Sequence, residues 1–169
     1  IASSLDGFIA EKNGSVKWLD AYQNKNEDYG YKKFYKSSGT LIMGSNTYRK
    51  ELSFGPWQHS EKKVYVLSRK KPQNVPDKKI VFYSGNLKKL VAKIKSEGGK
   101  NSWLVGGSKT LSSFLNNGLI DEAMIFIVPE ILNKGIPLFQ NISKKPKLEL
   151  ISTKVYKTGI VKLHYLVKN

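Results

Sequence analysis

Residues 103–109 read Trp-Leu-Val-Gly-Gly-Ser-Lys, and this stretch decides how we interpret the fold. Its three apolar residues predict a buried strand, which the glycine pair Gly106-Gly107 ends. A helix is predicted next by apolar residues at helical spacing: Leu111, Phe114 and Leu115. A helix that begins behind a glycine-rich turn offers backbone amides and the positive end of its dipole to an anion. The stretch therefore predicts either a diphosphate site or an ordinary tight turn between a strand and a helix.

A second strand-to-helix junction and a third strand end lie earlier in the chain. Residues 43–48 read Met-Gly-Ser-Asn-Thr-Tyr and follow an apolar run, so Ser45 and Thr47 can donate hydroxyl groups to a phosphate or simply cap a helix. The third junction is Leu67-Ser68-Arg69, which Lys70 and Lys71 follow. One hydroxyl group and three cations at a strand end suit a phosphate monoester, and a solvated basic loop is the alternative.

The rest of the chain predicts strands that alternate with helices. Strands are predicted at residues 1–5, 40–44, 63–67, 80–83, 103–105 and 123–128. Helices are predicted from Asn26 to about Ser38, up to about Leu52, from Leu87 to Gly98 and up to Gly118. Alternating residues over 148–167, with a turn at Lys157-Thr158-Gly159, predict a closing antiparallel hairpin. We therefore expect one α/β domain over residues 1–169, with a mostly parallel sheet, an antiparallel edge and ligand-binding loops at the carboxyl ends of the strands.

Composition excludes several classes of site. The chain has 169 residues, of which 40% are hydrophobic, and no apolar run is long enough to cross a membrane. Cysteine is absent and there are only two histidines, so we expect no disulfide, no metal site and no cysteine nucleophile. No secretion leader is recognisable, and we expect a cytoplasmic protein that does not bind a membrane.

The net charge of +16 raises the possibility of a nucleic-acid-binding domain. Only Arg49 and Arg69 among the 29 basic residues are arginines, although arginine forks are preferred for bases and phosphates. The lysine pairs are scattered along the chain and do not form one stripe. A solvated lysine-rich surface is the simpler interpretation, and we expect no nucleic-acid partner.

The three junctions, taken in order with a first segment at residues 4–10, resemble the dihydrofolate reductase superfamily. Within it, the chain is most similar to the family of the C-terminal reductase domain of the riboflavin-pathway deaminase/reductase. The matching segments are Ser-Leu-Asp-Gly-Phe-Ile-Ala at 4–10, Leu-Ile-Met-Gly-Ser-Asn-Thr-Tyr at 41–48, Val-Leu-Ser-Arg at 66–69, Leu-Val-Gly-Gly-Ser at 104–108, Gly-Leu-Ile-Asp-Glu at 118–122, and residues 129–139. This resemblance implies a three-layer fold with a mostly parallel central sheet, and a reductase that uses NADPH.

The resemblance also implies positions for the cofactor. The backbone of Ala2 and Ile9 would hold the nicotinamide carboxamide, and the loop with Gly14 and Ser15 would close over the ring. The diphosphate would meet two helix starts: Gly44, Ser45 and Thr47 at one, and Gly106, Gly107, Ser108 and Lys109 at the other. Ser68 and Arg69 would take the ribose 2′-phosphate that separates NADPH from NADH. In this superfamily a cis peptide commonly joins the paired glycines.

Two carboxylates are candidates for the substrate side of the site. Asp28 occupies the position at which the folate enzymes grip the pteridine, and a carboxylate can pair with an N–C–NH₂ edge and relay a proton. The alternative is that Glu27 and Asp28 are only favourable charges in the first turn of a helix capped by Asn26. Asp6 is the second candidate, and its alternative role is in the turn after the first strand.

Departures from the folate enzymes favour the riboflavin branch. Lys32 replaces a commonly aromatic residue, and Glu61 stands where an arginine binds the folate tail. We therefore expect hydride transfer to a pyrimidine- or pteridine-type substrate, most like the reduction of 5-amino-6-(5-phosphoribosylamino)uracil. The alternatives are a dihydrofolate reductase and a nucleotide-binding relative without catalysis, followed by a basic nucleic-acid-binding domain. Since family relatives are often dimers, we also expect a homodimer.

Overall fold

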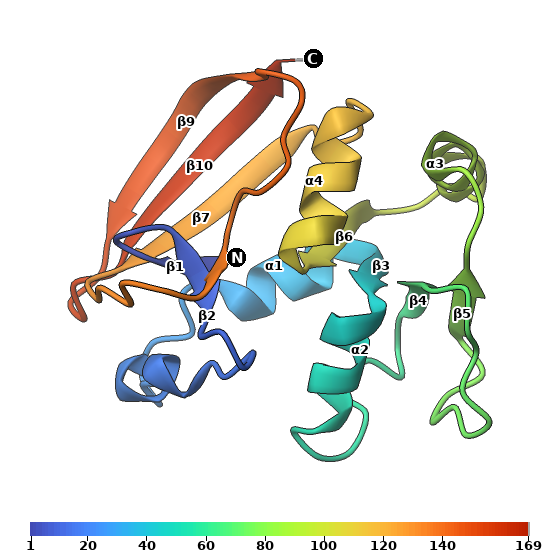
Figure 1. The fold of residues 1–169 in the computed structure, drawn as a ribbon, viewed down its shortest axis with the longest axis horizontal. Helices are drawn as coiled ribbons and strands as arrows, with labels where there is room; N and C mark the ends of the chain where they lie inside the picture. The colour runs from blue at the N-terminus through green and yellow to red at the C-terminus, as the bar shows by residue number, and fades with distance from the viewer. Residues whose placement is uncertain (169) are drawn as a thin grey trace. The chain divides into compact units, whose positions relative to one another are not determined.

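The computed structural model describes residues 1–168 and has the mixed α/β fold predicted from the sequence (Figure 1). The chain divides into two compact units. One unit comprises Tyr31–Leu111, and the other combines Ile1–Gly30 with the residues from Ser112 onward. No helix within residues 1–168 is both long enough and apolar enough to cross a membrane.

The Tyr31–Leu111 unit contains a four-stranded parallel sheet in the order β5-β4-β3-β6. Its strands are β3 (Ser38–Gly44), β4 (Lys63–Leu67), β5 (Ile80–Tyr83) and β6 (Asn101–Gly106). Its helices are α1 (Tyr31–Ser37), α2 (Ser45–Leu52) and α3 (Leu87–Ser96), followed by the start of α4 (Ser108–Asn116). Parallel strands need crossover connections, which α2 provides between β3 and β4 and α3 provides between β5 and β6. The strands predicted at 40–44, 63–67 and 80–83 are confirmed.

The core of this unit forms around consecutive apolar residues of β3 and β4. Three consecutive residues of each strand are at most 2% exposed: Leu41, Ile42 and Met43 of β3, and Val64, Tyr65 and Val66 of β4. Adjacent residues of a strand point to opposite faces of the sheet, so continuous burial is expected where both faces are covered. The apolar runs therefore fix the middle of each strand, and the polar residues that follow lie at the strand ends.

The other unit contains a mixed four-stranded sheet in the order β1-β7-β10-β9. Its strands are β1 (Ala2–Ser4), β7 (Glu122–Val128), β9 (Lys147–Val155) and β10 (Val161–Lys168). β1 runs parallel to β7, whereas β10 is antiparallel to both β7 and β9. The predicted closing hairpin is thus confirmed, and Gly159, at φ 85°, lies in its turn.

A short two-stranded pair, β2 (Phe8–Ala10) with β8 (Ile136–Pro137), was not predicted from the sequence. Gly135 makes this pairing possible, because a side-chain Cβ there would lie 2.2 Å from the carbonyl oxygen of Ala10. The sequence also gave no sign of the 3-10 helix η1 (Lys17–Tyr22).

The helix predicted from Asn26 begins later, at Tyr31, and this part of the prediction is wrong. Tyr29 and Gly30 have φ angles of 54° and 81°, which a right-handed helix cannot include. The Asn26 backbone N–H donates to Asn24 Oδ1, so Asn26 belongs to a turn and does not cap a helix. Glu27 and Asp28 consequently lie in the loop before α1.

Candidate active site

The three junctions predicted from the sequence, two from a strand into a helix and one from β4 into a loop, lie at one edge of the parallel sheet (Figure 1). Gly44 at the end of β3 is in register with Leu67 of β4, and Met43 is in register with Gly106 of β6. Three neighbouring strands therefore deliver their following residues to the same edge. The structure brings together nine of the residues expected to bind the cofactor: Gly44, Ser45, Thr47, Ser68, Arg69, Gly106, Gly107, Ser108 and Lys109.

Two of the junctions are in direct contact. The Gly107 backbone N–H donates to Thr47 Oγ1 at 2.9 Å, and the Gly106–Gly107 peptide is cis, as the family resemblance implied. A Cβ added at Gly44 would lie 2.5 Å from Thr110 Oγ1 and 4.0 Å from the Gly106 carbonyl oxygen. Sequence reasoning missed Thr110, because a threonine inside a predicted helix carries no local signal. The close backbone approach makes a glycine-lined cradle between the starts of α2 and α4.

The junction after β4 is a basic turn, which the hydroxyl group of Ser68 stabilises through two hydrogen bonds. Ser68 Oγ donates to the Lys70 carbonyl oxygen at 2.7 Å and accepts from the Lys70 backbone N–H at 3.1 Å. Arg69, Lys70 and Lys71 are exposed. Within residues 1–168 no hydrogen bond or ion pair holds the Arg69 guanidinium, so it is available to an anion at this edge of the sheet.

The other four residues expected to bind the cofactor belong to the other unit. Ala2 lies in β1 in register with Phe126, and Ile9 lies in β2. Gly14, at φ 80°, and Ser15 lie in a turn in which the Glu11 backbone N–H donates to the Ser15 carbonyl oxygen at 2.9 Å. Asn13 Oδ1 accepts from the Ser15 backbone N–H at 2.7 Å, so the turn is internally hydrogen-bonded.

Asp6, one of the two candidate acids, is held by three hydrogen bonds. Its carboxylate accepts from Ser4 Oγ at 2.6 Å and from the backbone N–H groups of Leu132 and Asn133 at 3.1 and 2.7 Å. The Ser4 hydroxyl is the largest cause that lowers the pKa of Asp6, and the two backbone donors add to it. Asn133 has a φ of 61°, so the carboxylate fastens a turn in a left-handed conformation. This geometry gives Asp6 a structural role. It corresponds to the alternative given in the sequence analysis, in which Asp6 serves the turn after the first strand.

We expect Asp6→Asn to destabilise the protein near neutral pH and to have much less effect in acid. A carboxyl group with a lowered pKa contributes stability above its unfolded pKa, and that contribution disappears as the pH falls through the folded value. Unfolding curves of the wild type and the variant, measured near neutral pH and at about pH 3, test this expectation. Asp77→Asn is the control, since the Asp77 carboxylate accepts one backbone N–H, from Lys79. A difference between wild type and Asp6→Asn that stays constant with pH would contradict a role for the charge.

Asp28, the other candidate acid, is exposed in the loop before α1. Its Oδ1 accepts from the Gly30 backbone N–H at 2.9 Å, while Glu27 Oε1 accepts from the Tyr29 backbone N–H at 2.9 Å. The Tyr156 hydroxyl donates to the Tyr29 carbonyl oxygen at 3.1 Å. Burial is the main cause that raises the pKa of Tyr156, and the charges of Glu27 and Asp28 add to it. Both carboxylates therefore lie near an aromatic cluster that includes Tyr29 and Tyr156, whose rings meet edge to face at 5.0 Å.

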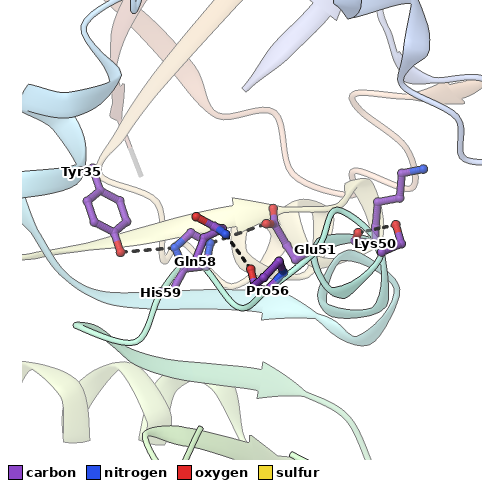
Figure 2. A network of polar contacts seen from close by, with 7 residues as sticks. Tyr35, Lys50, Glu51, Pro56, Gln58 and His59 are labelled. Atoms are coloured by element: carbon purple, nitrogen blue, oxygen red, sulfur yellow. Dashed lines mark hydrogen bonds and ion pairs between the residues drawn. The ribbon is translucent and has the colours of Figure 1, made fainter. Parts of the chain in front are cut away.

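Sequence reasoning missed a buried histidine in the segment before β4 entirely (Figure 2). His59 is 3% exposed, and its Nδ1 lies 3.3 Å from the hydroxyl oxygen of Tyr35 in α1. Its Nε2 lies 3.6 Å from Glu51 Oε2 near the end of α2, and the Trp57 ring packs against the imidazole at 5.1 Å. His59 thus links α1, α2 and the segment before β4 in the interior. One histidine between a glycine-proline loop and a strand carries no periodic signal that reveals such a position.

The part of the chain that the structure describes contains no cluster of side chains that could bind a metal ion. Residues 1–168 contain no group of three or more histidine, aspartate or glutamate side chains arranged to hold an ion. The candidate acids Asp6 and Asp28 instead accept hydrogen bonds from backbone N–H groups.

Comparison with known proteins gives a consistent result. The family model described as the RibD C-terminal domain matches residues 1–162. The uncharacterized protein YwjB of Bacillus subtilis (strain 168) is 35% identical over 167 residues, which cover 98% of this chain and 94% of YwjB. A Shewanella sp. PV-4 protein provisionally assigned to riboflavin biosynthesis has a crystal structure with a TM-score of 0.89 and 33% identity, covering 100% of this chain and 97% of that one.

The fold also extends to the folate enzymes. Dihydrofolate reductase from Enterococcus faecalis, solved with NADP(H) and RAB-propyl, has a TM-score of 0.67 at 15% identity. The superposition covers 99% of this chain and 94% of the dihydrofolate reductase chain. At this identity the likeness is one of fold, and it confirms the dihydrofolate reductase-like architecture that the sequence predicted.

Proposed function

Because the chain belongs to the RibD C-terminal domain family, we propose that it is an NADPH-dependent reductase of a pyrimidine- or pteridine-type heterocycle. The observation that carries the proposal is the meeting of two strand-to-helix junctions and the basic turn after β4 at one edge of a parallel sheet. The two junctions present glycine-lined helix starts, and the turn presents an unengaged arginine. Ligands of open parallel sheets bind at the carboxyl ends of the strands.

The residues at this edge fit a dinucleotide phosphate. Gly44 allows the starts of α2 and α4 to lie close together, since a Cβ there would lie 2.5 Å from Thr110 Oγ1. The helix starts at Ser45 and Ser108 would face the diphosphate, with Thr47 fixing the Gly107 backbone between them. Arg69 would pair with the 2′-phosphate, for which a guanidinium fork is well suited.

When bound, NADPH supplies the hydride, and the chain's own residues supply position and protons. In the proposed reaction Ala2, Ile9, Gly14 and Ser15 orient the nicotinamide. Asp28 pairs with an N–C–NH₂ edge of the substrate and relays a proton to it. The exposure of Asp28 in the loop before α1 supports this assignment, because its carboxylate is accessible to the edge of a substrate.

The proposed substrate is most like the ribosylaminopyrimidine phosphate of riboflavin biosynthesis. Family membership supports this class, and Glu61 supports it further. Glu61 is exposed at the position where a folate enzyme needs a cation for its glutamate tail, and it would repel a carboxylate there. The lysine-rich surface, with a net charge of +16, favours recruitment of a phosphorylated substrate.

We expect NADPH to raise the melting temperature of the protein, because a ligand that binds only the folded state stabilises it by mass action. Thermal unfolding with NADPH and with NADH measures the cofactor preference. A panel of pyrimidine and pteridine substrates, followed at the nicotinamide absorbance, measures the reaction. Gly107→Val is the control, since a branched side chain in the cradle should abolish the shift. No shift at NADPH concentrations far above those used by reductases would overturn the proposal.

A further inference from the structure

Each strand of the parallel sheet begins at or just after a lysine. The six lysines at the four strand starts are Lys36 (before β3), Lys62 and Lys63 (β4), Lys78 and Lys79 (before β5) and Lys100 (before β6). Neighbouring parallel strands begin at the same edge of a sheet, so the six lysines share the edge opposite the cofactor junctions. We call it the amino edge. Two lysine pairs that are far apart in the sequence are therefore neighbours in the fold.

The unit that contains this sheet carries nearly all of the net charge. Residues 31–111 include 18 basic and four acidic residues, a net charge of +14. The rest of the chain includes 11 basic and nine acidic residues, a net charge of +2. An asymmetry of this kind within one chain indicates contact with a polyanion. Four of the six lysines at the amino edge are exposed to water: Lys36, Lys78, Lys79 and Lys100.

Hydrogen bonds to backbone carbonyl groups fix three of these ammonium groups in place. The donors and acceptors are Lys79 Nζ and the Ser60 oxygen at 2.8 Å, Lys62 Nζ and the Ser38 oxygen at 2.7 Å, and Lys100 Nζ and the Lys36 oxygen at 2.8 Å. A carbonyl oxygen carries no net charge, and an ammonium group has three donors. Each of the three lysines is therefore held in position while it keeps its charge and unused donors for an anion.

Carboxylates offset only part of the charge at the amino edge. Glu97 accepts two hydrogen bonds from Lys63 Nζ, at 2.9 and 2.8 Å, and so neutralises that lysine. Asp77 accepts from the Lys79 backbone N–H at 2.8 Å, and Glu61 is exposed just before β4. Within residues 1–168, Lys63 is the one lysine of the six that forms an ion pair. The edge therefore keeps an excess of fixed positive charge.

We propose that the amino edge binds the phosphate backbone of a single-stranded nucleic acid. Neighbouring strands lie about 4.8 Å apart, so four strand starts place positive charge at regular intervals along about 14 Å, which a flexible chain of phosphates can follow. Lysine binds phosphate as a point charge and lacks the fork that reads a base, so binding should show no sequence preference. We therefore revise the expectation of no nucleic-acid partner, because the lysine pairs are scattered only in the sequence.

The arrangement of charge favours a single strand over a duplex or a lipid surface. The cations form one row, which matches one backbone, whereas a duplex presents two. Adsorption to a membrane needs apolar side chains that enter it, but Leu90 and Ile94 of the lysine-rich helix α3 are buried. The amino edge lies at the other end of the strands from the cofactor junctions, so the proposal does not depend on the proposed reductase activity.

The first experiment measures binding by fluorescence polarisation, with a fluorescein-labelled oligouridylate of about 20 nucleotides as the probe. The logarithm of the affinity should fall linearly with the logarithm of the salt concentration, with a slope of about −3, because about four neutralised phosphates each contribute about −0.7. No binding at a salt concentration of about 50 mM would overturn the proposal. Tighter binding to a duplex of the same length, or to phosphatidylserine vesicles, would also overturn it.

The second experiment locates the binding surface with three double variants that change the charge equally. Lys36→Glu/Lys78→Glu should weaken binding by about tenfold or more, since each reversed charge replaces an attraction by a repulsion. Neither side chain forms a hydrogen bond or ion pair within residues 1–168, so the variant should keep the wild-type circular dichroism spectrum. Lys36→Gln/Lys78→Gln, a smaller change, should weaken binding to an intermediate extent.

The two control variants reverse adjacent lysines elsewhere. Lys70→Glu/Lys71→Glu changes the opposite edge of the same sheet, and Lys144→Glu/Lys145→Glu changes the other unit. Both should bind the oligonucleotide much more tightly than Lys36→Glu/Lys78→Glu does. Equal losses in all three variants would mean that binding follows the net charge of the whole chain, and this result would overturn the assignment to the amino edge.

Discussion

Asp28→Asn is expected to lower turnover by about a hundredfold or more while NADPH binding stays near that of the wild type. A positioned acid or base contributes about 10²- to 10⁴-fold to a proton-transfer step, and an amide cannot take its place. Asn keeps an oxygen that can accept from the Gly30 backbone N–H, so the loop before α1 should retain its shape. Steady-state kinetics at saturating NADPH, together with a titration of NADPH, measures both quantities.

Glu27→Gln is the matched control for this prediction. Glu27 precedes Asp28 in the same loop and also accepts a backbone N–H, so the variant removes one neighbouring charge from the same surroundings. We expect its turnover to remain close to that of the wild type. If Asp28→Asn keeps its activity and Asp6→Asn loses it, the acid that serves the substrate is Asp6, in spite of its three structural hydrogen bonds.

Most strands and helices could be predicted because their signals are local. β4 and β7 are short apolar runs, α3 places Leu90 and Ile94 on one face, and the hairpin alternates around a glycine turn. The three junctions could be located for the same reason, since a glycine or a polar residue ends each apolar run. Their meeting at one edge follows from parallel strands in neighbouring positions, which the α/β pattern already implies.

The residues that sequence reasoning missed act over long distances along the chain. Asp6 binds backbone groups of residues 132 and 133, and His59 contacts Tyr35 across 24 residues. Neither contact leaves a periodic pattern or a characteristic spacing in the sequence from which it could be predicted. The prediction of where α1 begins was wrong for a different reason, because Tyr29 adopts a left-handed conformation that tyrosine rarely takes. Tertiary contacts of Tyr29, including the bond that its carbonyl oxygen accepts from Tyr156, accompany this conformation.

Arg69→Ala is expected to weaken NADPH binding by tenfold to a hundredfold and to leave NADH binding nearly unchanged. A charge-assisted hydrogen bond to a phosphate that carries close to two negative charges accounts for a loss of this size. Ser68 holds the turn through Lys70, so removal of the Arg69 side chain should not disturb the backbone. Lys70 and Lys71 are flexible point charges without a fork, so they should compensate only in part.

The salt dependence of binding separates a contact with the 2′-phosphate from a general effect of charge. Removing a direct ion pair should flatten the dependence of NADPH affinity on ionic strength, because fewer charges remain to be screened. Arg49→Ala removes the only other arginine, an exposed residue of α2 that donates to Asn46 Oδ1, and should change both cofactors little. Fluorescence titrations of the wild type and the two variants with NADPH and NADH, at low and high salt, give the comparison. An equal loss of NADPH and NADH affinity in Arg69→Ala would mean that Arg69 maintains the turn after β4, and the preference for NADPH would then have to arise elsewhere.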